Sequence, residues 1–116
     1  MKTTNNEFSD KTDLTKEQVT ELEKKHGKLV KMEVGDKDGM DEPMYFWFKR
    51  PDLNTIRLAQ KKLINDRDVM AYSTIIVRNS VLNGLDVIDN DEGALIALLA
   101  VADEITTNKV ARIVKN

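Results

Sequence analysis

Cysteine is absent from this chain of 116 residues, and histidine occurs once, at His26. The lack of thiols excludes disulfide bonds, thiol catalysis and zinc sites built on thiolates. The five glycines are scattered, so there is no glycine-rich phosphate-binding loop. No apolar run approaches the roughly 18 residues that a membrane span needs. The N-terminal sequence MKTTNNEFSDKTD also lacks the apolar segment of a signal peptide. We therefore expect an intracellular protein with no membrane partner.

The chain nevertheless contains enough apolar side chains for one folded domain. Hydrophobic residues make up 41% and charged residues 33% of the sequence, and the net charge is −2 at pH 7. This balance is typical of globular proteins and not of disordered chains. The first 13 residues are polar apart from Phe8. We expect a flexible N-terminal arm over 1–13 and a single domain over 14–116.

Residue spacing predicts a helix and a β-hairpin in the first half of the domain. Thr15 and Gln18 have the spacing of a capping box, and the helix that follows is expected to end at Gly27. Apolar and charged residues then alternate over 28–34, as in a half-buried strand. A second strand is expected over 44–49, after a loop rich in turn formers, so the two segments predict a hairpin.

The first helix after the hairpin is expected to begin at Asp52, which can cap it, and to end at 65–66. Arg57 and Lys61 share one side of this helix. Another side is apolar and is predicted to face the core, with Leu53, Ile56, Ala59, Leu63 and Ile64.

Two more helices are expected in the rest of the chain. The first covers 68–83 and is apolar almost all round, which predicts the most buried position, and Gly84 is expected to end it. Residues 85–90 are predicted to be a link, with 89 or 90 capping the last helix. The apolar face of that helix is made of Leu95, Leu98, Leu99, Ala102 and Ile105, with Val110 and Ile113 spaced to extend it.

These elements predict an α+β fold, with an N-terminal helix, a β-hairpin and a three-helix C-terminal bundle. Ile76 and Leu98 are expected to be almost fully buried in its core.

The polar clusters lack the spacing of a catalytic or metal site. His26 stands at a predicted helix end, where a cationic or hydrogen-bonding side chain is favoured for structural reasons. The acidic loop 35–43 departs from a calcium-binding EF-hand, because its glycine is fourth and not sixth from Asp36. Helix capping explains most of a second acidic group over 86–92. We therefore expect no enzyme and no metal or cofactor.

The most informative feature is MYFWF, which holds four of the chain's six aromatic residues. Strand side chains alternate between faces, so Phe46 and Phe48 are expected to face the helical core. Tyr45 and Trp47 then point the other way. Either the helix over 15–26 covers them, or they form an aromatic face for self-association or for a client protein.

Basic side chains are concentrated in the middle of the chain. Residues 44–84 carry seven basic and three acidic side chains. This surplus suits a solvated helix face or an acidic protein partner. It is small beside the basic excess of nucleic-acid-binding domains, which argues against nucleic acid as the partner.

The segment from 44 to 113 resembles the small tail assembly chaperones of tailed bacteriophages and prophages. The likeness rests on an aromatic strand followed by FKRPD (48–52) and a basic helix. It continues through VRNSVLNGLD (77–86) and DNDEGALIALLAVADEI (89–105).

This resemblance implies a non-enzymatic assembly factor in the cytoplasm of the bacterial host cell. Such proteins are thought to bind the long tape-measure protein, keep it soluble and help tail-tube subunits to polymerise around it. A homo-oligomer formed through the hairpin is also expected. The candidate partner-binding residues are Tyr45, Trp47, Lys49, Arg50, Arg57 and Lys61.

Two other functions remain as alternatives. A small tail or connector protein would stay in the virion, whereas a chaperone would leave it. A regulator that binds nucleic acid would use the basic middle of the chain, and its binding would depend on salt.

Overall fold

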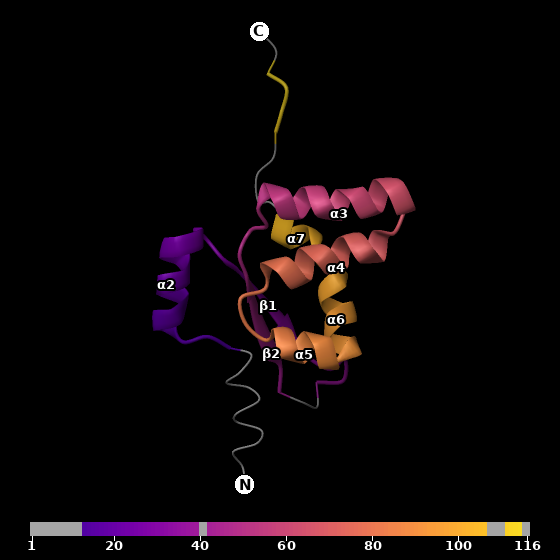
Figure 1. The fold of residues 1–116 in the computed structure, drawn as a ribbon. Helices are drawn as coiled ribbons and strands as arrows, with labels where there is room; N and C mark the ends of the chain where they lie inside the picture. Colours follow the sequence, from indigo (N-terminus) through magenta and orange to yellow (C-terminus); the bar gives the residue numbers. More distant parts are fainter. Residues whose placement is uncertain (1–12, 40–41, 107–110, 115–116) are drawn as a thin grey trace.

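The computed structural model describes residues 13–39, 42–106 and 111–114, so the expected arm over 1–13 lies outside these residues except for Asp13. Within them the chain has an α+β fold, with a helix, an antiparallel hairpin and then further helices (Figure 1). The elements are α2 (Lys16–His26), β1 (Val30–Val34), β2 (Met44–Phe48), α3 (Leu53–Asp66), α4 (Val69–Ser80), α5 (Leu85–Asn90), α6 (Glu92–Leu99) and α7 (Asp103–Thr106). None of these helices is long and apolar enough to cross a membrane.

Helix α2 begins and ends as its sequence predicts. The Thr15 hydroxyl accepts a hydrogen bond from the Gln18 backbone N–H at 3.2 Å, and the Gln18 side chain accepts one from the Thr15 N–H at 2.9 Å. Gly27 ends the helix with a φ of 85°, which glycine adopts without steric cost. No residue of α2 is buried, and the helix lies to one side of the other elements (Figure 1).

Strands β1 and β2 pair in an antiparallel register that places Met32 opposite Phe46 and Val30 opposite Phe48. Phe46 and Phe48 are fully buried, which confirms that they face the core. Trp47 lies on the opposite face of the strand and is half-buried.

Helix α3 is capped as expected, because the Asp52 carboxylate accepts a hydrogen bond from the Thr55 N–H at 2.8 Å. The predicted core face is wrong at its two ends. Ala59 is buried, but Leu53 and Ile64 are exposed. The reason is geometric: α3 packs mainly on α4, and Leu53 and Ile64 lie away from the side that carries Ala59.

Helix α4 ends at Ser80 and does not continue to 83 as predicted. Residues 81–83 run beside β2 instead, with Val81 bridged to Phe48. A backbone group that forms a hydrogen bond to β2, such as the Leu82 N–H, cannot form one within α4, which explains why α4 ends at Ser80. Gly84 then caps the start of α5 with a φ of 78° and does not end α4.

The prediction for 85–106 is also wrong in detail. The expected link is α5, which buries Val87 and Ile88 against the core. Asp91, and not residue 89 or 90, caps the next helix by accepting a hydrogen bond from the Ala94 N–H. The expected last helix is divided by a turn into α6 and α7.

Residues 111–114 are not helical, so Ile113 does not extend the last helix, and Val110 lies outside the described residues.

The core lies between the inner face of the hairpin and the C-terminal helices. Ile76 and Leu98 are fully buried in it, as predicted. Helix α4 is central, because it contacts α3 as well as α6 and α7. Five helices, and not three, therefore follow the hairpin in the described part of the chain.

Candidate partner-binding surfaces

The outer face of the hairpin carries the predicted aromatic pair. The Lys31 ammonium lies 4.4 Å from the centre of the Tyr45 ring and 5.1 Å from that of Trp47, within the range of cation–π attraction. The Trp47 indole N–H donates a hydrogen bond to the Asp13 carboxylate at 3.1 Å. Both aromatic residues are half-buried, so this face is partly occupied by the chain itself.

One edge of β2 is held by the segment after α4. The Asn83 side-chain amide accepts a hydrogen bond from the Trp47 N–H at 2.7 Å and donates one to the Tyr45 carbonyl at 3.0 Å. The Leu82 N–H donates to the Trp47 carbonyl at 2.8 Å. Sequence reasoning missed this role of Asn83, because local spacing places it at the end of a helix.

The backbone of Lys49 and the side chain of Arg50 both form hydrogen bonds to other parts of the fold. The Lys49 N–H donates a hydrogen bond to the Ser80 carbonyl at 3.0 Å. The Arg50 guanidinium donates hydrogen bonds to the carbonyls of Glu104 and Ile105 at 2.6 and 3.0 Å. Arg50 therefore satisfies carbonyl groups of α7 and fixes that short helix to the end of β2.

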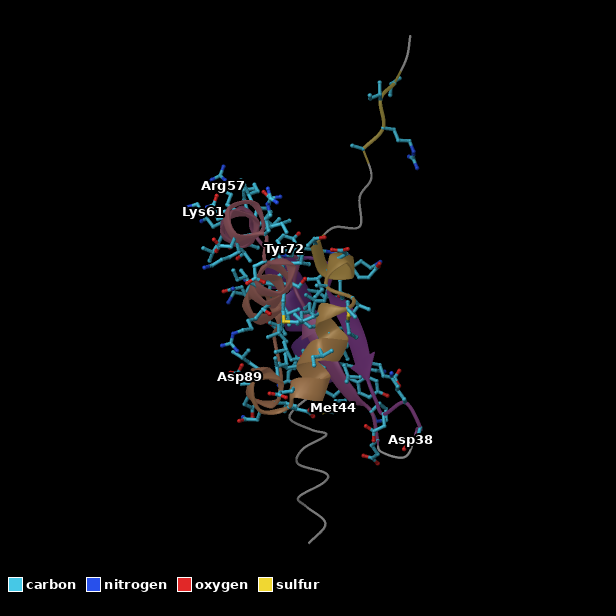
Figure 2. All side chains as sticks on the ribbon, turned by 90° about the vertical axis from the view of Figure 1, so that its right-hand side faces the viewer. Asp38, Met44, Arg57, Lys61, Tyr72 and Asp89 are labelled. Carbon is cyan, nitrogen blue, oxygen red and sulfur yellow. The ribbon has the colours of Figure 1, made fainter. Side chains whose placement is uncertain are left out.

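Arg57 and Lys61 lie together on the outward side of α3 (Figure 2). Within the described residues, neither forms an ion pair, whereas Lys62 on the same helix pairs with Asp66 at 3.8 Å. Their i, i+4 spacing places them on one stripe, and exposed Leu53 precedes Arg57 by four residues. The outer stripe of α3 is thus both basic and partly apolar.

Three large apolar residues are exposed where α3 turns into α4. Ile64 is 73%, Val69 63% and Met70 64% exposed. The turn projects beyond α5 and α6 (Figure 1), so nothing in the described chain covers these side chains. We call Ile64, Val69 and Met70 the helical tip. Sequence reasoning missed the tip, because their apolar character favoured core positions.

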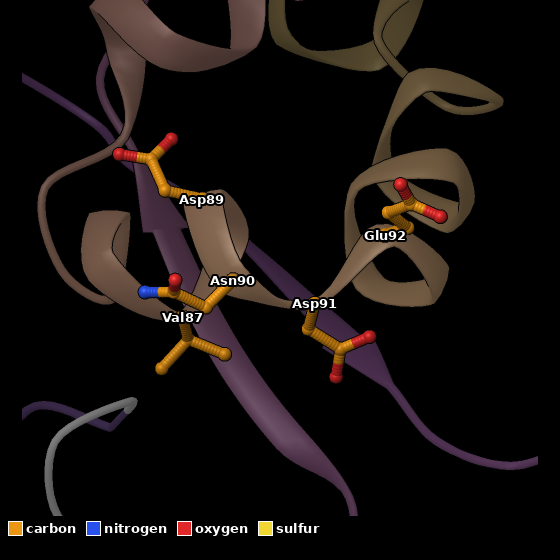
Figure 3. Close-up of a pocket in the computed structure, with 5 residues that line it drawn as sticks. All are labelled: Val87, Asp89, Asn90, Asp91 and Glu92. Carbon is orange, nitrogen blue, oxygen red and sulfur yellow. The ribbon is translucent and has the colours of Figure 1, made fainter.

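The acidic group after α4 lines an open hollow between α5 and α6, but its carboxylates do not converge. Asp89, Asp91 and Glu92 point in different directions around it (Figure 3). Asp89 forms an ion pair with Arg78, and Asp91 caps α6. No group of metal-ligating side chains gathers in the described ranges. Charge pairing accounts for Asp89 and capping for Asp91, and Glu92 stands in the first turn of α6, where an acidic side chain is favoured.

The predicted contact residues thus fall into separate groups. Tyr45 and Trp47 lie on the outer face of the hairpin, and Arg57 and Lys61 lie on the outer stripe of α3. Arg50 stands between these elements in sequence but its guanidinium turns to α7.

Comparison with known proteins bears on the fold. No protein-family model and no curated protein matches the chain. Among solved structures, the uncharacterised protein rbstp2171 from Bacillus stearothermophilus is similar, with 20% sequence identity and a TM-score of 0.52. The match covers 83% of this chain and 98% of that protein. At this level of identity, the likeness shows a shared α+β fold.

Proposed function

We propose that this protein is a non-enzymatic tail assembly chaperone of a tailed phage or prophage, with the tape-measure protein as its client. The observation that carries the proposal is the helical tip, which exposes three large apolar side chains where α3 turns into α4. Arg57 and Lys61 lie on the same helix α3, and neither forms an ion pair within the described residues. The resemblance of residues 44–113 to such chaperones supports the same function.

The chemistry of this surface favours one kind of client. Exposed apolar side chains that lie near one another on a small domain are typical of protein-binding sites. An amphipathic helix can place its apolar side on Ile64, Val69 and Met70, while acidic residues at its margin meet Arg57 and Lys61. A long helical protein with exposed apolar faces aggregates unless such faces are covered. Reversible covering at the tip would keep that client soluble until the tail tube forms around it.

The test is co-expression of this chain with the tape-measure protein of the same phage or prophage in bacterial cytoplasm, where we place its function. The soluble fraction of the tape-measure protein is measured with and without the chain. We expect Val69→Ser combined with Met70→Ser to abolish the gain in soluble client. Ile96→Ser is the control, because Ile96 is also exposed but belongs to α6 and not to the helical tip.

Charge is tested in a second pair of variants. Arg57→Glu with Lys61→Glu should weaken client binding by about tenfold or more and reduce its dependence on salt. Lys16→Glu with Lys24→Glu changes the net charge equally on α2 and should leave binding unchanged. An equal loss of client affinity in both pairs of variants would mean that the loss depends on net charge alone. That result would contradict a specific site on α3.

Mass spectrometry of purified particles separates this function from that of a tail or connector component. A chaperone is absent from finished virions, whereas a structural protein is present in a fixed ratio to the tail-tube subunit. Its presence in that ratio would overturn the proposal.

A further inference from the structure

In the part of the chain that the structure describes, strand β1 pairs with another strand on one edge only. In an antiparallel strand, the backbone groups of successive residues point to opposite sides. The Trp47 N–H and carbonyl are bonded to Asn83 and Leu82, so Phe46 and Phe48 direct theirs to β1. On β1, Val30, Met32 and Val34 therefore bond to β2.

Lys31 and Glu33 direct their backbone groups away from β2, at the open edge. Both side chains are exposed, and within the described residues no backbone group bonds to their N–H or carbonyl groups. The strand that leads into the turn with Asp38 lies at the margin of the ribbon, with no helix drawn beyond it (Figure 2). An exposed strand edge of this kind can pair with another strand.

The sequence of this edge is complementary to itself. In an antiparallel pair of two β1 strands centred on Met32, Lys31 of each copy lies opposite Glu33 of the other. This register also fits the backbone, because Lys31 and Glu33 are the residues whose N–H and carbonyl groups face outward. Each such pair would exchange two hydrogen bonds, and the two ion pairs would lie on the outer face of the sheet.

We infer that a second copy of this chain binds at the β1 edge, forming a symmetric dimer with a continuous four-stranded sheet in the order β2-β1-β1-β2. The two Met32 residues form the central pair without mutual hydrogen bonds, where side chains approach most closely. Half-buried Met32 thereby loses its remaining exposure, which adds apolar burial to the polar edge. The inference goes beyond the proposed function and does not depend on a client.

The experiment uses the full chain and a swap of the two charges. Sedimentation velocity over a range of protein concentrations gives the dimer dissociation constant. Lys31→Glu and Glu33→Lys each place like charges opposite one another in the self-paired register. Each variant should weaken the homodimer by about tenfold or more. Glu33→Lys leaves Lys31 above Tyr45 and Trp47, so it separates the edge from the cation–π contact.

The same register predicts that the two single variants bind each other. An equimolar mixture of Lys31→Glu and Glu33→Lys should form a heterodimer, because both cross-strand pairs then have opposite charges. The double variant with both changes should dimerise as the wild type does. Thermal melts and circular dichroism verify that each variant is folded.

Several results would overturn the inference. A wild-type chain that stays monomeric at about millimolar concentration would rule out the dimer. A dimer that neither single variant weakens would lie elsewhere on the molecule. Loss of dimer in all variants, without heterodimer formation, would contradict this register.

Discussion

The two ends of α4 have similar apolar composition and opposite environments. Near its C-terminus, Ile76 and Val77 are fully buried, whereas Val69 and Met70 in its first turn are mostly exposed. The difference comes from what packs against each end. At the inner end, Ile76 and Val77 pack in the core with residues of the hairpin and the C-terminal helices, while at the outer end the turn from α3 to α4 projects beyond α5 and α6 (Figure 1).

This contrast teaches that the apolar pattern of a helix does not fix its burial. Where a helix extends beyond the elements that pack against it, its apolar side chains are exposed to solvent. The length of that exposed part depends on elements that are distant in the sequence. At the inner end apolar side chains stabilise the fold, and at the outer end they remain free to contact a partner.

The sharpest test of the contrast is a matched pair of alanine variants. Ile76→Ala should lower the free energy of unfolding by about 2–5 kcal/mol, because it leaves a cavity in a packed core. Val69→Ala should change it by no more than about 0.5 kcal/mol, since its side chain is already solvated. Urea unfolding followed by circular dichroism measures both. Similar losses at the two positions would show that the outer end is also core.

The next effect concerns residues 81–83, which follow the C-terminal end of α4 and form hydrogen bonds to β2. Asn83→Ala removes both amide bonds to the strand and leaves the Trp47 N–H without its partner. We expect a loss of about 1–3 kcal/mol in the free energy of unfolding. Asn79→Ala is the control, because its amide donates only to the Ile75 carbonyl on an exposed side of α4. If the two variants are equally stable, water replaces the Asn83 amide without cost.

A smaller effect, of opposite sign, is expected at Ser80. This residue is fully buried at the inner end of α4, and its hydroxyl has no hydrogen-bond partner in the described part of the chain. Ser80→Ala removes that unsatisfied group and should raise the free energy of unfolding by about 1 kcal/mol. The same urea titration measures it. A destabilised variant would mean that the hydroxyl is hydrogen-bonded in solution.

Local chemistry made much of the fold predictable. The capping residues Thr15 and Asp52, and the alternation of apolar and charged residues over 28–34, act over a few neighbours, and the structure contains both caps and the strand β1. The fold class followed from the order of these elements.

Features that depend on distant contacts were not predictable. Gly84 fits the end of one helix or the start of another, and only the packing of Val87 and Ile88 selects the second. The guanidinium of Arg50 donates hydrogen bonds to the carbonyl groups of Glu104 and Ile105, which lie far along the chain, so local spacing could not predict these bonds. Ile64 has a core-like spacing but its side chain is exposed. No pattern over neighbouring residues contains that information.

The smallest expected effect concerns pH at the start of α3, where Asp52 lies near the inner end of α4. The Thr55 backbone N–H, followed by the Thr55 side chain and the charge of Lys49, holds the pKa of Asp52 below its usual value of 3.8. Because the folded-state pKa is lowered, the ionised carboxylate stabilises the fold at pH values above 3.8. This stabilisation is lost as the pH falls through the lowered pKa.

Asp52→Asn keeps an oxygen at the cap but removes the charge, so the variant should be less stable than the wild type at neutral pH. Unfolding titrations at a series of pH values should show that difference shrinking as the solution is acidified below 3.8. A difference that stays constant with pH would mean that the cap acts through its geometry alone and not through its charge.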